Sequence, residues 1–276
     1  MSNRFTRREW LRAASAGVMG AAAAGAQGPR AQGPNVLMIA VDDLNDWIGV
    51  LGGHPQDVTP NIDRLAKQGV TFRRAYCQAP MCNPSRASLM TGIRPSTSAV
   101  YGNNDVWRDG LPNAVSLSEH FRLHGYEVLG GGKIFHGNQN EARSWDYYYN
   151  TPGFLHPADE PVNGLGSGHF DWGALDAPES ETADTMLAEW ASDYLRKKHN
   201  RPFFLAPGFY RPHLPWYVPR AYFDQFPEER TELPAFLEND LDDVPKSAIR
   251  SLADHEKVTG SGQWKRAVAA YLACIR

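Results

Sequence analysis

The sequence has few cysteines, and their spacing excludes a disulfide-rich protein and a zinc finger. Three occur among 276 residues, Cys77, Cys82 and Cys274. Cys77 and Cys82 are five positions apart and Cys274 is remote, so neither a disulfide framework nor a zinc-finger spacing is present. We expect Cys77 and Cys274 to be core thiols, with a bridge between them as the alternative. Loops of the form G-x-x-x-x-G-K-S/T and G-x-G-x-x-G are absent, which excludes the usual nucleotide-binding motifs.

Neither an excess of positive charge nor a long hydrophobic run is present. The formal net charge is −3, which gives no indication of nonspecific polyanion binding, so no nucleic-acid partner is expected. An anionic substrate would instead be held by a local cluster of cations. The apolar run at residues 13–26 is short and rich in Ala and Gly, so no stable membrane span is expected. The length predicts one large α/β domain or a domain with a fragment of another.

The N-terminus has the pattern of an export signal. Arg7 and Arg8 precede the small apolar run, which ends in an A-x-A-like cleavage site at residues 24–26. We predict a twin-arginine (Tat) signal peptide at residues 1–26 and a linker at 27–33; a disordered basic tail is the alternative. The signal would make the Tat machinery a partner and place a bacterial protein in the periplasm or outside the cell.

Two carboxylates follow the first predicted strand. Residues 35–41 (NVLMIAV) form a nearly continuous apolar run, which is typical of a strand covered on both faces in an α/β sheet. Asp42 and Asp43 would then lie at the carboxyl edge of the sheet, where open α/β folds bind ligands. Both can reach one cation only if the strand ends in a turn there. Hard oxygen ligands of this kind favour calcium or magnesium.

A pentapeptide in the next part of the chain carries the strongest functional signal. Residues 82–86 read Cys-Asn-Pro-Ser-Arg, which resembles the C-x-P-S-R signature of the type I sulfatases, the formylglycine-dependent family. The order of the further motifs is most similar to the iduronate-2-sulfatase branch, from about Pro34 to the C-terminus. These motifs are Thr59–Ala66 (TPNIDRLA), Ser88–Gly92 (SLMTG), Gly132–His136 (GKIFH) and Arg211–Pro215 (RPHLP).

The resemblance implies a modified nucleophile and a bound cation. In this family the signature cysteine, here Cys82, is oxidised after synthesis to formylglycine, so a formylglycine-generating enzyme becomes an expected partner. Hydrated formylglycine supplies a geminal diol that attacks sulfur. Asp42, Asp43 and residue 82 are the implied metal ligands, with calcium as the expected ion and magnesium as the alternative.

The resemblance also implies roles for four further catalytic residues. Arg86, with the cation, would lower the cost of deprotonating the nucleophile, and Lys133 would neutralise sulfate oxygens. We assign His213 to the leaving oxygen and its protonation. His136 would take the proton from the second hydroxyl, although the two histidine roles can be exchanged. The expected substrate class is a sulfated sugar or polysaccharide.

The family pattern also implies an alkaline-phosphatase-like α/β fold, with a mostly parallel sheet flanked by helices. Residues 34–276 are expected to be the N-terminal part of the catalytic domain, because the family's second metal pair and a later lysine have no counterpart here and residues 263–276 read as a helix without a C-cap. The sheet and the metal site would then be incomplete. Two alternatives stay open: a phosphate or phosphonate ester hydrolase of the same superfamily, and a non-catalytic chain.

The pattern of apolar and turn residues predicts the remaining elements. Residues 150–176 are expected to be a surface excursion. We predict strands at 70–76, 126–129 and 202–209, and helices at 60–69, 84–90, 116–124, 181–198 and 263–276.

Overall fold

The computed structural model describes residues 33–152, 161–165, 168–247, 249 and 253–276. The predicted signal peptide at residues 1–26 and nearly all of the linker at 27–33 lie outside this part of the chain. Within it, no helix has the length and apolar character needed to cross a membrane.

The core of the fold is a five-stranded parallel sheet. Its strand order is β1-β6-β3-β4, and β2 also pairs with β6. Residue pairs Val36↔Phe204 and Ala40↔Gly208 place β1 and β2 one after the other along β6. The strands are β1 (Val36–Leu37), β2 (Ala40–Val41), β3 (Glu127–Gly132), β4 (Tyr147–Tyr149) and β6 (Phe203–Phe209).

The first predicted strand is therefore confirmed, but its burial on both faces is wrong. Leu37, Ile39 and Val41 alternate along one face and are 44%, 51% and 36% exposed. β1 and β2 pair only with β6 among the described strands. A continuous apolar run therefore does not show whether both faces of a strand are buried, because burial depends on which other elements pack against each face.

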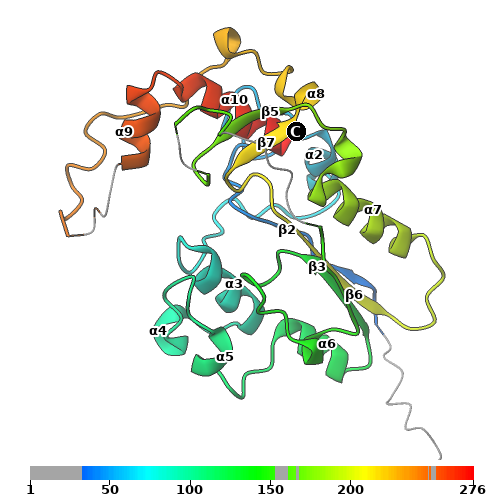
Figure 1. Cartoon of the computed structure of the whole chain (residues 1–276). Helices are drawn as coiled ribbons and strands as arrows, with labels where there is room; N and C mark the ends of the chain where they lie inside the picture. The colour runs from blue at the N-terminus through cyan, green and yellow to red at the C-terminus, as the bar shows by residue number, and fades with distance from the viewer. Residues whose placement is uncertain (1–32, 153–160, 166–167, 248, 250–252) are drawn as a thin grey trace, which may run out of the picture.

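Helices cover the two faces of the central strands (Figure 1). On one face, Val128, Phe204 and Ala206 pack against residues of α3 (Cys82–Thr91) and α5 (Trp107–Gly110), among them Met90 and Trp107. The short α4 (Pro95–Ser98) and α6 (Leu117–Leu123) lie on the same side.

The opposite face is covered by one long helix. Leu129, Phe203 and Leu205 pack against Ala191 and Tyr194 of α7 (Ala183–Leu195). Because neighbouring strand residues point to opposite faces, β3 and β6 contribute to both cores. This three-layer arrangement confirms the predicted α/β class.

Three glycines in β3 serve packing inside the sheet layer. A Cβ at Gly130 would come within 2.6 Å of the Trp145 side chain, and one at Gly131 within 2.7 Å of Leu187. At Gly132, φ is +67° and a Cβ would overlap the carbonyl oxygen of Gly208. The glycines therefore let neighbouring protein groups approach the strand.

A smaller group of elements lies beside the main sheet (Figure 1). Two parallel strands, β5 (Trp172–Leu175) and β7 (Trp216–Pro219), pack against α10 (Trp264–Ile275). β5 falls inside the segment predicted as a surface excursion, and Trp172 is fully buried there, so that prediction was wrong for the end of the segment. The remaining elements are α2 (Pro60–Ala66), α8 (Arg220–Phe223), α9 (Ala253–Gly260), η1 (Ala142–Ser144), η2 (Glu179–Glu181) and η3 (Glu228–Arg230).

The predicted helices are confirmed as α2, α3, α6, α7 and α10, and the strands at 126–129 and 202–209 as β3 and β6. The capping box of α6 forms, with Ser116 and Glu119 each accepting from the other's backbone N–H. The strand at 70–76 is wrong: those residues are irregular, and Val70, Phe72 and Tyr76 are 78–81% exposed. Cys77 is also exposed and not a core thiol, and all three cysteines are free.

Candidate active site

Three parallel strands bring charged residues to one edge of the main sheet. Asp42 follows β2, Lys133 follows β3, and the loop with His213 follows β6. Because β2 and β3 both pair with β6 in parallel, their carboxyl ends meet at the same edge. The fold therefore assembles residues that are more than 170 positions apart in sequence.

Helix α3 brings the signature residues to this edge. Cys82 is its first residue, and the side-chain amide of the neighbouring Asn83 donates to the carbonyl oxygens of Gly102 (2.8 Å) and Asp105 (2.7 Å). These bonds fix the start of the helix. Gly92 ends it in a left-handed conformation at φ +70°. Arg86 lies one turn after Cys82, on the same side of the helix.

Asp42 is a buried carboxylate held between two cations. Its Oδ1 accepts from Arg86 Nη2 at 2.6 Å, and its Oδ2 contacts the Lys133 ammonium group. All three side chains are about 6–7% exposed. Burial by itself would raise the pKa of Asp42, but Arg86 and Lys133 together lower it below its usual value. The carboxylate is therefore ionised at neutral pH.

Arg86 also ties the helix to the end of β3. Its Nη1 donates to the carbonyl oxygen of Ile134 at 3.2 Å and to that of Lys133. The guanidinium thus connects α3, β2 and the turn that carries Lys133. Its fork of donors suits this arrangement better than a single ammonium group would.

The Cys82 thiol lies beside Lys133. The distance from Cys82 Sγ to Lys133 Nζ is 3.6 Å, and Cys82 is partly buried. Burial raises the pKa of Cys82, and Asp42 and Asp43 act in the same direction, while Lys133 opposes them. The thiol is therefore mostly protonated at neutral pH, and an unmodified Cys82 is a poor nucleophile.

His213 faces the acidic pair from the loop after β6. Its Nε2 is 3.7 Å from Asp43 Oδ2 and 4.0 Å from Asp42 Oδ2, and its Nδ1 contacts the carbonyl oxygen of Leu214. That contact leaves Nε2 directed at the site. Ligand atoms of Asp42, Cys82 and His213 all lie within 4.8 Å of one another.

Asp43 occupies the turn that ends the strand, as predicted. It has a φ of +56°, and its side chain is 52% exposed. Tyr271 of α10 holds this turn, because its hydroxyl donates to the Asp43 carbonyl oxygen (2.8 Å) and accepts from the Asn45 N–H (3.1 Å). The metal-capable cluster among the described residues contains His213 where the sequence suggested Asp43.

Part of a coordination shell for a hard cation is present. Asp42 offers an ionised carboxylate, and Asp43 lies within reach of the same histidine nitrogen. Lys133 and Arg86 occupy the Asp42 oxygens in this structure. Calcium takes about six to eight oxygen ligands, so the described residues fit a cation but supply only part of its shell.

His136 lies near these groups on the chain segment after Lys133. Its Nδ1 is buried without a hydrogen-bond partner. Burial lowers the pKa of His136, and the nearby Lys133 and Arg86 lower it further. The imidazole is therefore neutral at neutral pH and can accept a proton.

Two further residues position the site, and sequence reasoning did not find them. Asp184, in the first turn of α7, accepts from the backbone N–H groups of Tyr210 (3.0 Å) and Arg211 (2.8 Å) and so fixes the loop that carries His213. Tyr271 holds the Asp43 turn from α10. Asp184 had one sequence signal, its place two residues after the helix-capping Thr182. Tyr271 had none.

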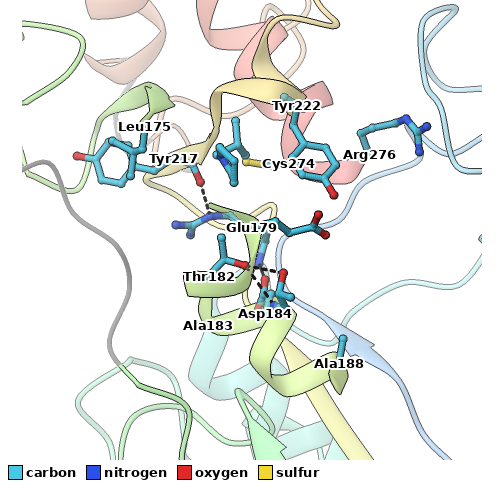
Figure 2. Close-up of a pocket in the computed structure, with 15 residues that line it drawn as sticks. Leu175, Glu179, Thr182, Ala183, Asp184, Ala188, Tyr217, Tyr222, Cys274 and Arg276 are labelled. Carbon is cyan, nitrogen blue, oxygen red and sulfur yellow. Dashed lines mark hydrogen bonds between the residues drawn. The ribbon is translucent and has the colours of Figure 1, made fainter. Parts of the chain in front are cut away.

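A cavity of about 260 Å³ lies behind the His213 loop, on the Asp184 side. Figure 2 shows Asp184 and Thr182 on one wall and Tyr217 and Cys274 on the other. None of the seven predicted catalytic and metal-binding residues lines it. All seven instead lie at or near the carboxyl edge described above.

Comparison with known proteins agrees with this arrangement. The family model described as Sulfatase matches residues 34–276. A sulfatase of Formosa agariphila is 39% identical over 267 residues, which cover 88% of this chain and 52% of that protein. The iduronate 2-sulfatase of Homo sapiens is 33% identical over 214 residues, or 72% of this chain and 38% of that protein.

Solved structures agree on the fold. The crystal structure of the phosphonate monoester hydrolase of Agrobacterium radiobacter superposes with a TM-score of 0.64 at 22% identity, covering 88% of this chain and 56% of that one. The central sheet and flanking helices are those of the alkaline-phosphatase-like fold. The chain spans about half the length of the relatives it matches. By its family model and relatives, the chain belongs to the sulfatase family.

Proposed function

We propose that this chain carries the nucleophile and the anion-binding residues of an enzyme that hydrolyses sulfate esters of a sulfated sugar. One observation carries the proposal: Cys82, Lys133 and the Asp42–Arg86 ion pair converge at one sheet edge, at the N-terminus of α3. Partial positive charge at a helix N-terminus favours an anion such as sulfate. The iduronate 2-sulfatase relative, at 33% identity, supports the sugar class.

The nucleophile is proposed to be formylglycine made from Cys82 by a formylglycine-generating enzyme. The raised pKa of the Cys82 thiol supports this, because a protonated thiol attacks poorly and the effect of Lys133 does not outweigh that of burial. When formed, the modification supplies a geminal diol as the attacking group. The start of α3 then positions residue 82 against the sulfate.

A divalent cation is proposed to be held by Asp42, Asp43 and residue 82, with His213 Nε2 close to the same point. Oxygen ligands favour calcium, with magnesium as the alternative. A bound cation would supply a positive charge that stabilises developing negative charge on oxygen. Asp42 would remain ionised under this cation because its pKa is already low.

Proton transfer is assigned to the two histidines. His136 is neutral because burial and the neighbouring cations lower its pKa, which suits a general base. His213 is then the group that protonates the leaving oxygen, and its loop is held in place by Asp184. Lys133 neutralises sulfate oxygens, and Arg86, with the cation, lowers the cost of deprotonating the nucleophile. Their fixed positions, set by bonds to Asp42 and to the β3 turn, reduce reorganisation during the reaction.

Delivery to the periplasm or the cell exterior by a twin-arginine signal at residues 1–26 remains part of this proposal. It rests on the sequence pattern of Arg7, Arg8 and the apolar run that follows them. N-terminal sequencing of the protein recovered from periplasm and medium would test it, with a start near Gln27 as the expected result.

The modification is tested by mass spectrometry of the tryptic peptide covering residues 75–86, taken from the native host. We expect residue 82 to carry an aldehyde and its hydrate. Cys77, in the same peptide, is the internal control and should stay a thiol. An unmodified Cys82 would favour the alternative of a non-catalytic chain.

The reaction class is tested by comparing turnover of an aryl sulfate with turnover of the matching aryl phosphate and aryl phosphonate. Sulfate should be released fastest, and Cys82→Ala should abolish its release while Cys77→Ala leaves it unchanged. Faster phosphate or phosphonate hydrolysis would favour the alternative of a phosphate or phosphonate ester hydrolase of the same superfamily. A solved structure of similar fold is described as a phosphonate monoester hydrolase.

A further inference from the structure

An aromatic groove of about 450 Å³ opens directly from the candidate active site. Asp43, Pro212 and Leu214 line one end of it. Asp43 Oδ2 is 3.7 Å from His213 Nε2, and Pro212 and Leu214 are the neighbours of His213 in sequence. The groove therefore begins where a sulfate ester would be cleaved and has a volume typical of small-molecule sites, roughly 300–1,000 Å³.

Six aromatic side chains dominate the lining. They are Trp47, Phe170, Trp172, Trp216, Trp264 and Tyr271. They come from separate parts of the chain. Trp47 lies in the loop after β2, Phe170 lies two residues before β5, and the other four belong to β5, β7 and α10. No single sequence motif encodes this groove, which explains why it was not visible in the sequence.

The rings are held in place by one another. Trp47 meets Tyr271 edge to face at 5.2 Å between ring centroids, and Trp216 meets the same tyrosine at 5.4 Å. Trp216 Nε1 also donates to the carbonyl oxygen of Pro212 at 2.6 Å. The aromatic walls are thus preformed and linked to the loop that carries His213, which lowers the entropy cost of binding.

The charge of the groove limits what it can bind. Besides Tyr271, its ionisable lining residues are Asp43, Asp254 and His255, and neither lysine nor arginine is among the described residues that line it. Lys257 of α9 is outside this lining, with its Nζ 5.5 Å from the centroid of the Phe170 ring. Asp43 is at the cation end, whereas Asp254 lies in the first turn of α9 and is exposed. A carboxylate of the substrate in this groove would meet the Asp254 carboxylate, and no lysine or arginine among the described lining residues would offset the repulsion.

We propose that the groove binds an uncharged pyranose ring of the sulfated substrate and disfavours a uronate. The apolar C–H face of such a ring can lie against the aromatic walls, while its hydroxyl groups meet polar atoms of Asn45, Asp254 and His255 at the rim. This inference rests on the proposed function. The substrate proposed here therefore differs from iduronate, the uronate in the name of the iduronate 2-sulfatase relative.

The proposal is tested with two substrates that differ only at C6, methyl glucoside 2-sulfate and methyl glucuronide 2-sulfate. We expect the neutral substrate to have a kcat/KM about tenfold higher or more, since like charges at close range are strongly unfavourable. Asp254→Lys should shift this ratio toward the uronate. Glu256→Lys, on the same helix but outside the groove lining, is the matched control and should leave the ratio unchanged.

The aromatic wall is tested by Trp264→Ala, with Trp190→Ala as the control because Trp190 packs against Tyr149 outside the groove. Trp264→Ala should raise KM for the neutral substrate about tenfold or more, and Trp190→Ala should not. Equal or faster turnover of the uronate by the unaltered protein, or equal effects of both tryptophan substitutions, would overturn the inference.

A binding measurement keeps this test separate from the proposed function. In Cys82→Ala, tryptophan fluorescence is titrated with each substrate, so no turnover is needed. If the unaltered protein releases no sulfate from either sugar or from an aryl sulfate, the proposed function is refuted but the groove assignment is not. Tighter binding of the glucoside would still support the groove assignment, and tighter or equal binding of the glucuronide would refute it.

Discussion

Removing the Tyr271 hydroxyl should loosen the turn that presents Asp43. In Tyr271→Phe the aromatic ring stays in place, but the Asp43 carbonyl oxygen and the Asn45 N–H lose their shared partner. Asp43 has a φ of +56°, in the left-handed region, which residues with a side chain adopt less readily than glycine, although aspartate tolerates it better than most. Tyr271 is 8% exposed, so water does not easily replace its hydroxyl group.

The expected loss follows from these two bonds. Leaving a buried polar group without a partner costs about 1–3 kcal/mol. Both backbone groups here are only partly buried, so we expect a total of about 1–2 kcal/mol for the pair. In a chain of this size, each 1 kcal/mol lowers the melting temperature by roughly 2–4 °C, which gives a fall of about 2–8 °C.

Urea unfolding followed by far-UV circular dichroism measures the free energy, and calorimetry measures the melting temperature. Tyr101→Phe is the control for the substitution itself, because Tyr101 is 62% exposed. Calcium affinity of the folded proteins is compared by titration calorimetry, and Tyr271→Phe should bind about tenfold more weakly, since outer-shell partners of metal ligands commonly have effects of that size. A change in unfolding free energy below about 0.5 kcal/mol with unchanged calcium binding would refute this reasoning.

Three further predictions concern the charged centre and the capping of α6. Arg86→Ala should destabilise the fold by about 3 kcal/mol in urea unfolding, the lower end for breaking a buried ion pair, because Lys133 still pairs with Asp42; a loss below about 1 kcal/mol would contradict this. Ser116→Ala should cost about 1 kcal/mol by removing the capping box, and an unchanged melting temperature would count against it. The lowered pKa of His136 keeps the imidazole neutral, so the acid limb of kcat should lie below the ordinary histidine pKa of about 6.5, with activity falling as pH falls through it. His136→Gln should lower kcat by about 10²–10⁴-fold and remove that limb, and an acid limb retained in the variant would assign it to another group.

Local signals predicted local structure well. Helices were predicted at residues 116–124 and 84–90, and α6 and α3 lie there. Both depend on hydrogen bonds and backbone preferences within a few residues, so the sequence contains the needed information. The strand predicted at residues 70–76 failed because an apolar run does not specify a neighbouring strand.

The candidate catalytic residues were predicted from the resemblance of short motifs, while their electrostatics came from packing. Sequence placed Asp42, Arg86 and Lys133 in one site, but only the fold showed both cations on the same buried carboxylate. The depressed pKa of His136 and the raised pKa of Cys82 likewise follow from burial and from charges brought in by other elements.

The sequence by itself determined the family, the order of the site motifs and most helices, because each of these depends on residues that are close together in the sequence. Tertiary structure alone decided that Tyr271 holds the Asp43 turn, that Asp184 fixes the His213 loop, and that the aromatic groove opens beside Asp43. Tyr271 and Asp43 are 228 positions apart. Contacts over such separations depend on how parallel strands and helices pack, and no local pattern records them.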